Sequence, residues 1–330
     1  MSLLSTKGAA SAQGFGLFAA GPGCCLSDGN KGIFALGTLQ VGASQNPSST
    51  RNKYTYATCL STASGVGSAS NNSYFGAASG NNTRGIFHLG NNNVGTATAT
   101  RDKYTYPSCT STSSGVAVAS QASYGGSAAG NSTRGIFALG IAGCESTIRN
   151  KYTYSSCTST ASGVASASLA TGFASSVGNS TRGIFKVGTS STAVRNKYTY
   201  ACCTSTASGV GSASMTTYQG SAAGNSTVGI FALGLNDCGV RQTTRNKYTY
   251  SSCTSTASGV GVASCSSRLG SAAGNSTRGI FALGDGSSGG IATRNKYTYS
   301  TCASTRTGVA DASTASEGGS AASWASCVNT

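Results

Sequence analysis

A block of six residues, Arg-Asn-Lys-Tyr-Thr-Tyr, returns through this chain at regular intervals, and this limits the possible folds more than any other feature. The block begins at Arg51, Arg101, Arg149, Arg195, Arg245 and Arg294, with Asp102 replacing Asn in the second copy. A second block, Gly-Ile-Phe-x-Leu/Val-Gly, begins at Gly32, Gly85, Gly135, Gly183, Gly229 and Gly279. Two apolar blocks in each unit of about 50 residues predict a repeat architecture.

Each repeat contains four short β-strand candidates, as the third repeat shows. The continuous apolar run at 135–140 predicts a strand buried on both faces. Residues 150–157 predict a second strand, with Lys, Thr and Cys on one face and the two tyrosines on the other. Residues 158–164 are polar and predict an outer edge strand. A less regular piece at 169–176 then leads into the next repeat.

An apolar block ending in Gly, a loop of about ten residues and a Tyr-centred strand resemble the kelch repeat, whose period is near 50. The resemblance extends from residue 14 to about residue 320. One glycine stands where kelch repeats have two, and the only tryptophan is Trp324. The pairing of Gly-Asn-Ser-Thr-x-Gly-Ile-Phe with Asn-Lys-Tyr-Thr-Tyr also resembles repeat proteins of bacteriophages and some bacteria.

Six sets of four strands predict an all-β fold, a six-bladed kelch-like β-propeller. Its single domain spans 14–330 and follows a tail at 1–13. Residues 14–21 predict an early strand, and the last repeat, from 297 to 328, has no following Gly-Ile-Phe block. We therefore expect one blade to be completed by both chain termini. Seven blades and a β-solenoid are the alternatives.

The net charge of +15 is largely periodic. Arginines of the repeated block are followed two residues later by Lys53, Lys103, Lys151, Lys197, Lys247 and Lys296. Further cations precede the Gly-Ile-Phe blocks at Lys31, Arg84, Arg134, Arg182 and Arg278, and Val228 breaks this series. In a closed repeat fold these charges form a ring that favours anionic partners. The alternative is that each cation braces one repeat against the next.

The 13 cysteines include no Cys-x-x-Cys pair, so the zinc-ribbon and redox signatures are absent. Six of them follow the second tyrosine of the block by three residues, at Cys59, Cys109, Cys157, Cys203, Cys253 and Cys302. We expect these to be buried free thiols. The candidates for a disulfide are Cys24 or Cys25 with Cys327, which would join the two chain ends.

The sequence offers little for catalysis. His88 is the only histidine, and the acidic residues are scattered singly. Asp237 and Asp285 both follow Gly-Ile-Phe blocks and could share a propeller face, but a glycosidase also needs closely spaced carboxylates. We therefore predict no enzyme activity, no cofactor and no metal, with a propeller glycosidase or lyase as the third hypothesis for function.

The leading hypothesis is a structural and adhesion component of a virus particle, most simply a phage tail fibre, tail-tip or head-decoration protein. It would bind a host-surface glycan, in particular an anionic polysaccharide, or another virion protein, with no specific nucleic acid partner and no membrane insertion. The N-terminus shows no signal peptide, which predicts assembly in a host cytoplasm. The alternative is a kelch-like protein-binding scaffold in a bacterial cytoplasm or at the cell surface.

The candidate binding residues are the cations of the six repeated blocks together with Asp237 and Asp285. The candidate binding loops follow the Gly-Ile-Phe blocks, since they are the least repetitive segments. They span 38–50, 91–100, 141–148, 189–194, 235–244 and 285–293.

Overall fold

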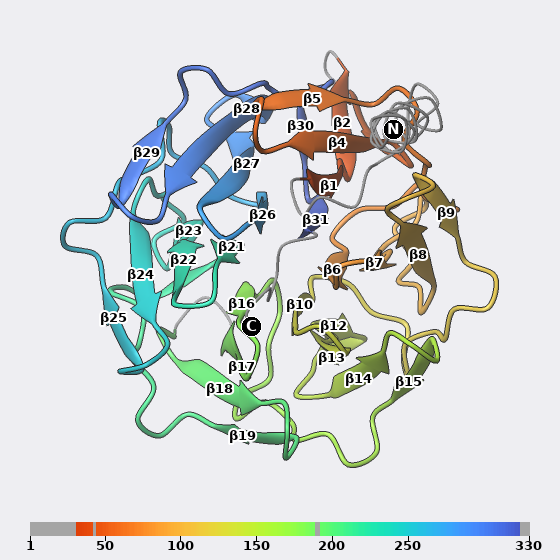
Figure 1. Ribbon diagram of the computed structural model, residues 1–330, viewed down its shortest axis with the longest axis horizontal. Helices are drawn as coiled ribbons and strands as arrows, with labels where there is room; N and C mark the ends of the chain where they lie inside the picture. Colours follow the sequence, from red (N-terminus) through yellow and green to blue (C-terminus); the bar gives the residue numbers. More distant parts are fainter. Residues whose placement is uncertain (1–30, 42–43, 189–191, 324–330) are drawn as a thin grey trace, which may run out of the picture.

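The chain forms an all-β propeller, seen down its axis in the computed structural model of Figure 1. The structure describes residues 31–41, 44–188 and 192–323. Within these ranges the regular structure consists of β-strands, and no helix is present. Each blade contains four antiparallel strands, which lie side by side in order from the axis to the rim.

The strands occupy four positions in each blade, counted outward from the axis. The innermost strands are β31 (Ser320–Ser323), β6 (Ala77–Gly80), β10 (Ser127–Gly130), β16 (Ser176–Gly178), β21 (Ser221–Gly224) and β26 (Ser271–Gly274). The second strands are β1 (Lys31–Ala35), β7 (Arg84–His88), β11 (Arg134–Ala138), β17 (Arg182–Lys186), β22 (Val228–Ala232) and β27 (Arg278–Gly286). The third strands are β4 (Arg51–Thr55), β8 (Arg101–Thr105), β14 (Arg149–Thr153), β18 (Arg195–Thr199), β24 (Arg245–Thr249) and β28 (Gly289–Thr298). The outer strands are β5 (Leu60–Thr62), β9 (Thr110–Thr112), β15 (Thr158–Thr160), β19 (Thr204–Thr206), β25 (Thr254–Thr256) and β29 (Ala303–Thr305).

We number the blades 1 to 6 in the order of these lists. Blades 1 to 5 are separate four-stranded sheets. Blade 6, formed by β26, β27, β28 and β29, has the same pairing but belongs to a seven-stranded sheet. The link runs through β30 (Ser316–Glu317) to the hairpin of β2 (Thr38–Val41) and β3 (Ser44–Pro47). Free-standing sheets therefore number five, and the fused blade fills the sixth position of the ring. The β-solenoid alternative is wrong.

The ring is closed by strands from opposite ends of the described chain. β1 pairs antiparallel with β31, with Gly32 opposite Ser323 and Ala35 opposite Ser320. The prediction that one blade combines both ends of the chain is thus confirmed. The early strand predicted at 14–21 and the tail at 1–13 lie outside the described residues.

Small residues line the propeller axis because six strands converge there. The innermost strands contact one another in the cyclic order β31, β6, β10, β16, β21, β26 and back to β31. Their sequences, Ser-Ala-Ala-Gly in β10, β21 and β26 and similar in the others, leave an axial cavity of only about 80 Å³, lined by Ala, Gly, Ser79 and Val177. Larger side chains at these positions would collide with the neighbouring blade.

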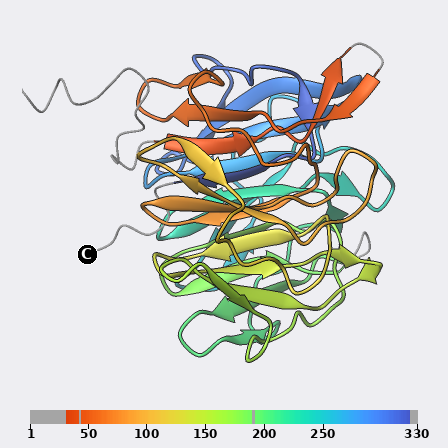
Figure 2. The ribbon, with the colours of Figure 1, turned by 90° about the vertical axis from the view of Figure 1, so that its right-hand side faces the viewer.

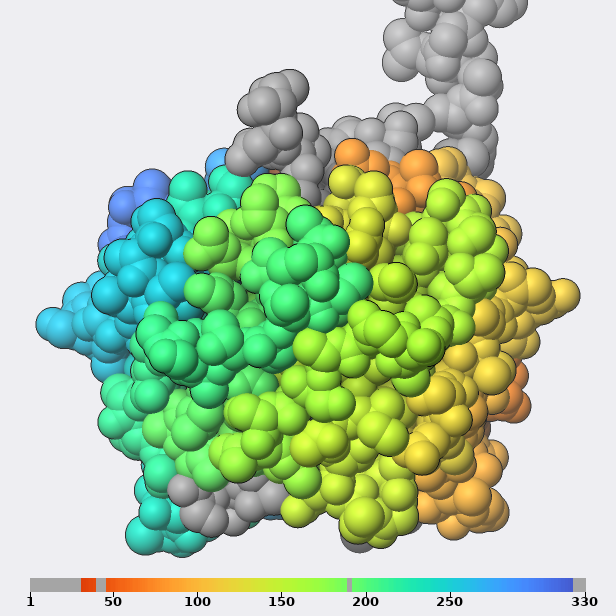
Figure 3. Space-filling model, turned by 90° about the horizontal axis from the view of Figure 1, so that it is seen from below, coloured from red at the N-terminus to blue at the C-terminus, as the bar shows by residue number. Residues whose placement is uncertain are grey.

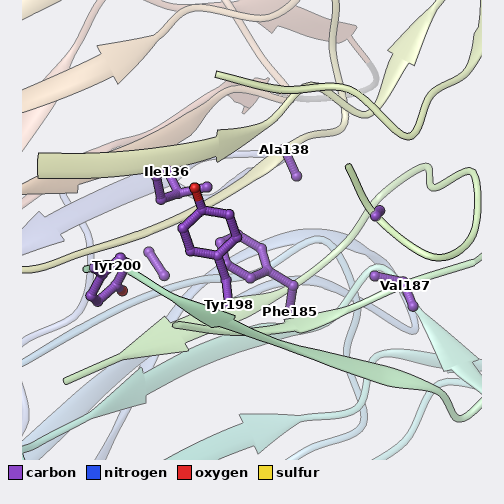
Figure 4. Packing of buried hydrophobic residues seen from close by; sticks show 8 residues of the cluster. Ile136, Ala138, Phe185, Val187, Tyr198 and Tyr200 are labelled. Carbon is purple, nitrogen blue, oxygen red and sulfur yellow. The ribbon is translucent and has the colours of Figure 1, made fainter. Parts of the chain in front are cut away.

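The hydrophobic core is divided into clusters between successive blades, as Figure 4 shows for blades 3 and 4. There Ile136 of β11 packs with Phe185 of β17 and with Tyr198 and Tyr200. Equivalent clusters lie at the other five junctions. The tyrosine pairs are therefore packing groups buried between sheets, and this leaves no surface for the base stacking that a Tyr-rich basic platform would suggest.

Two predicted strand boundaries are wrong. The strand expected at 150–157 corresponds to β14, which ends at Thr153 and is followed by a tight turn. Cys157 adopts a φ of 55° in this turn, so it does not share a strand face with the lysine. The outer strand expected at 158–164 corresponds to β15, which ends at Thr160, ahead of Gly163, whose φ is +66°.

The described parts of the connections after the Gly-Ile-Phe blocks lie on one face of the disc, which we call the variable-loop face. Residues 42–43 and 189–191 of the predicted loops lie outside the described residues. These connections include β2–β3, the small hairpin of β12 (Ile141–Ala142) and β13 (Cys144–Glu145), and the strand β23 (Leu235–Asn236), which pairs with β20 (Thr217–Tyr218). The Asn-Ser-Thr turns that join innermost and second strands lie on the opposite face, the Asn-Ser-Thr face. Figure 2 shows the disc edge-on, and Figure 3 shows successive blades along its rim.

Two glycines test how strictly the turns depend on backbone shape. A Cβ at Gly140 (φ +81°) would meet the carbonyl oxygen of Tyr124 and lie 2.6 Å from backbone atoms of Gly125 and Gly126. At Gly163 (φ +66°) nothing lies within 4 Å. We expect Gly163→Ala to lower the free energy of unfolding by about 1 kcal/mol, the cost of a left-handed alanine. Gly140→Ala should lose about 2 kcal/mol or more, since backbone must also move. Urea denaturation of both variants measures the difference, and equal losses would contradict this explanation.

Candidate functional site

The arginines of the repeated block lie between blades. The Nη2 of Arg51 is 3.0 Å from Asp102 Oδ2 on the next blade, and its Nη1 donates to the Ser68 carbonyl at 3.2 Å. Its guanidinium carbon lies 4.5 Å from the centre of the Phe87 ring, a cation–π distance. The same contacts recur around the disc, and Arg294 closes the ring by donating to Asn52 of blade 1 at 3.2 Å.

All six of these arginines are almost completely buried. Burial lowers the pKa of five of them to about 10, namely Arg101, Arg149, Arg195, Arg245 and Arg294. They brace one repeat against the next, as the alternative interpretation of the sequence had it. In these positions they do not face a partner at the surface.

The six lysines of the repeated block are half-buried. Lys247 Nζ approaches Cys302 Sγ of the next blade at 3.7 Å. The lysines are therefore the members of the candidate cation set that keep access to solvent. The six repeat cysteines were expected to be buried free thiols. Five are free thiols but only half-buried, namely Cys59, Cys157, Cys203, Cys253 and Cys302. Cys109 is buried but disulfide-bonded, so the prediction of a free thiol is wrong there. The predicted disulfide of Cys25 with Cys327 lies outside the described residues.

The two candidate aspartates lie on the variable-loop face, in neighbouring blades, but in different environments. Asp237 is exposed in a turn. Asp285 is buried, and its Oδ2 lies 2.8 Å from Arg241 Nη2 and 2.5 Å from Arg268 Nε. A carboxylate held by two guanidiniums is suited to fixing loops in place.

His88 is buried inside blade 2, where its Nε2 is 2.9 Å from the Ser123 carbonyl oxygen. Burial, with the nearby Arg101, lowers its pKa to about 4. The histidine is thus held neutral and away from solvent. Among the described residues, no group of three or more His, Cys, Asp or Glu side chains could hold a metal ion.

A second ring of residues surrounds the axis on the variable-loop face. One residue from each blade has a φ between 51° and 64° and immediately precedes an innermost strand region: Phe75, Gly125, Phe173, Gln219, Leu269 and Gly318. Backbone hydrogen bonds run from blade to blade, for example from Leu269 N to Gln219 O at 2.8 Å and from Phe75 N to Gly318 O at 2.7 Å. The repeat fixes this backbone ring, while its side chains differ from blade to blade.

We call the surface built on this ring the axial mouth. It surrounds a cavity of about 60 Å³ lined by Phe75, Phe173, Gln219 and Leu269, together with Ala174 and glycines. We include in it the residues that directly precede the ring positions, namely Tyr74, Tyr124, Tyr218, Arg268 and Glu317. These side chains are half-buried. The axial mouth is therefore partly open to solvent at the centre of the face.

One half of the axial mouth is aromatic. The ring centres of Phe75 and Phe173 are 5.1 Å apart, and Tyr124 lies 6.0 Å from Phe173. Two glycines of the backbone ring make room for them, since a Cβ at Gly318 would lie 2.6 Å from Phe75. This half thus presents a cluster of edge-to-face rings.

The other half carries charge. Glu317 lies near Asp285 and its two arginines, Arg241 and Arg268. Desolvation is the largest cause that raises the pKa of Glu317, and the charge of Asp285 adds to it, while the two arginines oppose the rise. Aromatic faces beside a few fixed polar groups are the usual composition of a small-molecule binding site.

The axial mouth lies outside the predicted binding loops, which follow the Gly-Ile-Phe blocks. It belongs to the piece before each innermost strand, which the sequence predicted to be irregular. The signal that could have found the site is a bulky residue beside a glycine, as in Phe75-Gly76 and Gly172-Phe173.

The comparisons with known proteins bear on the fold. A scan against protein-family models found no match, and a search of curated proteins found none. Among solved structures, one titled "Structure of YjhT" aligns with a TM-score of 0.59, over 76% of this chain and 87% of that chain, at 8% identity. At this identity the similarity shows the propeller fold alone. In the described part of the chain, no helix has the length and apolar character needed to span a membrane.

Proposed function

We propose that the protein is a non-enzymatic binding propeller, an adhesion component of a virus particle that attaches to a host-surface glycan through its variable-loop face. The observation that carries this proposal is the axial mouth. Its side chains vary on an otherwise repetitive scaffold, and function on a symmetric fold tends to reside where the repeat is broken.

The chemistry of the axial mouth suits a carbohydrate. The apolar faces of sugar rings pack on aromatic side chains such as Phe75 and Phe173, and sugar hydroxyls pair with groups such as Gln219, Arg268 and Glu317. Buried aromatic side chains usually contribute most to such binding.

The kelch-like and phage parts of the proposal rest on the sequence repeats. The apolar block ending in Gly, followed by a loop and a Tyr-centred strand, supports the kelch-like part. The pairing of Gly-Asn-Ser-Thr-x-Gly-Ile-Phe with Asn-Lys-Tyr-Thr-Tyr supports the phage part. A tail fibre, tail-tip or head-decoration protein needs a rigid scaffold that presents a binding face, and a closed propeller supplies one.

A protein partner is the second candidate. Val94 and Val240, 81% and 55% exposed, lie in loops of the variable-loop face. Exposed apolar side chains next to an aromatic cluster are also typical of protein-binding surfaces.

The test is the binding of bacterial envelope polysaccharide to the purified chain at low and high salt. We expect saturable binding that persists at high salt, because stacking contacts are not screened. Phe75→Ala and Phe173→Ala should each lower the affinity about tenfold or more.

Leu60→Ala is the matched control, since Leu60 is 64% exposed on the outer strand β5, far from the axis, and its loss should leave the affinity unchanged. Binding that disappears with salt, or that Leu60→Ala weakens as much as Phe173→Ala, would contradict the proposal.

A further inference from the structure

A second set of arginines links the blades on the Asn-Ser-Thr face. The Nη1 atoms of these arginines donate to the carbonyl of the second block tyrosine on the next blade. The pairs are Arg84 with Tyr154 at 2.8 Å, Arg134 with Tyr200 at 2.9 Å, Arg182 with Tyr250 at 3.0 Å and Arg278 with Tyr56 at 3.0 Å. Each of these side chains crosses the gap between two blades.

The junction between blades 5 and 6 is different because Val228 stands where the arginine would be. A valine is too short to reach the carbonyl of Tyr299 on blade 6. A groove of about 420 Å³ lies here, and both Val228 and Tyr299 line it. This volume is within the range of small-molecule sites, about 300–1,000 Å³.

The groove is cationic and rich in hydroxyl groups. Lys296 and Arg278 line it, as do the hydroxyl-bearing residues Thr227, Ser276, Thr277, Thr298 and Ser300. Among the described residues, no Asp or Glu lines the groove and no acceptor is hydrogen-bonded to the Lys296 ammonium. The positive charge here is thus available to a ligand.

We propose that this groove binds an acidic sugar, a carboxylate-bearing monosaccharide unit of a polysaccharide. The carboxylate pairs with Lys296 and with the charge of Arg278. Sugar hydroxyls donate to the Tyr299 carbonyl, the equivalent of the acceptor that an arginine occupies at four other junctions, and exchange hydrogen bonds with the threonine hydroxyls. The site lies on the face opposite the axial mouth, so its existence does not depend on the proposed attachment function.

The variant Val228→Arg tests whether binding depends on the open groove or only on positive charge. It refills the groove with the residue that four other junctions carry, so the variant should fold normally, yet it adds a positive charge. Titrating the full chain with a tetrasaccharide of glucuronate and glucose, we expect Val228→Arg to lower the affinity about tenfold or more. Lys296→Gln should lower it about fivefold to tenfold. A neutral glucose tetrasaccharide should bind about tenfold more weakly than the acidic one.

Lys151→Gln is the matched control, because it removes the equivalent lysine at the junction that Arg84 fills, and it should change the affinity less than twofold. Phe173→Ala, in the axial mouth, should also leave this binding unchanged. Equal or tighter binding by Val228→Arg would show a generic charge effect and overturn the proposal. So would inorganic phosphate binding as tightly as the tetrasaccharide with the same response to Val228→Arg, since the groove would then recognise an anion without recognising a sugar.

Discussion

Replacing Arg51 by Met is expected to lower the free energy of unfolding by about 3–5 kcal/mol, the largest effect of any single substitution that we predict. The reason lies on blade 2. The Asp102 carboxylate is fully buried 3.0 Å from the Arg51 guanidinium, and methionine would leave that charge without its cation. The remaining donors to Asp102 are the Ser70 amide at 2.8 Å, the Ser70 hydroxyl at 2.7 Å and the Ser111 hydroxyl at 3.5 Å, and none of them carries a compensating charge.

The repeat provides a matched control at another junction. Arg149 makes the same contacts as Arg51, but its partner is the neutral Asn196 at 3.2 Å. Arg149→Met should therefore cost less, about 1–3 kcal/mol, for the unsatisfied hydrogen-bond acceptors alone. Adding Asp102→Asn to Arg51→Met should bring the loss close to that of Arg149→Met. Urea denaturation of the four proteins measures these differences, and equal losses for the two single arginine variants would show that Asp102 is compensated in another way.

Much of the fold follows from the sequence because every repeat has the same order of buried and exposed segments. The period near 50, the two apolar blocks and the polar Thr-Ser-Thr segment are sufficient to predict four strands per repeat and the outer edge position of the last. The closure of the ring could be predicted too, although its innermost strand in blade 1 is β31 at 320–323. The strand ends could not be predicted, because the residue in the left-handed conformation after β14 is Cys157 and no glycine marks this turn in the sequence.

The fate of the cations shows what a linear pattern cannot supply. In the sequence, the arginine and lysine of Arg-Asn-Lys are equivalent charges two residues apart. In the propeller, Arg51 extends across the junction to Phe87 and Asp102, while Lys53 stays half-buried. Which of the two cations is fully buried between the blades depends on how one sheet packs on another, and spacing along one strand does not contain that information.

The axial mouth depends on the same kind of long-range convergence. Phe75 and Phe173 belong to blades 2 and 4 and are nearly a hundred residues apart in the sequence, yet their rings are 5.1 Å apart. They meet only because six equivalent turns are brought to one axis, with a glycine at 125 between them. A repeat pattern predicts the six equivalent positions, but the identity of the site depends on which positions deviate from the pattern.

The stability of the protein is expected to fall as the pH is lowered from about 6.5 to about 4, with His88 as a principal cause. In the unfolded chain the histidine has its ordinary pKa of 6.5, whereas burial lowers its pKa to about 4 in the folded protein. Between these values the unfolded state binds a proton that the folded state does not, so protonation favours unfolding. This contribution is fully present above pH 6.5 and is lost progressively toward pH 4, by about 3 kcal/mol in total.

The repeat again provides the control, since alanine occupies the position equivalent to His88 at Ala138, Ala232 and Ala282. At neutral pH, His88→Ala should lower the free energy of unfolding, because the histidine's volume and its contact with Ser123 are lost. This loss should not depend on pH above about 6.5. The difference in unfolding free energy between the two proteins should then shrink as the pH falls from 6.5 to 4, or reverse in sign. Carboxylates titrate in both proteins and cancel in this difference. A difference that stays constant over this range would mean that His88 binds its proton equally well in the folded and unfolded states, and the lowered pKa of the buried histidine would have to be abandoned.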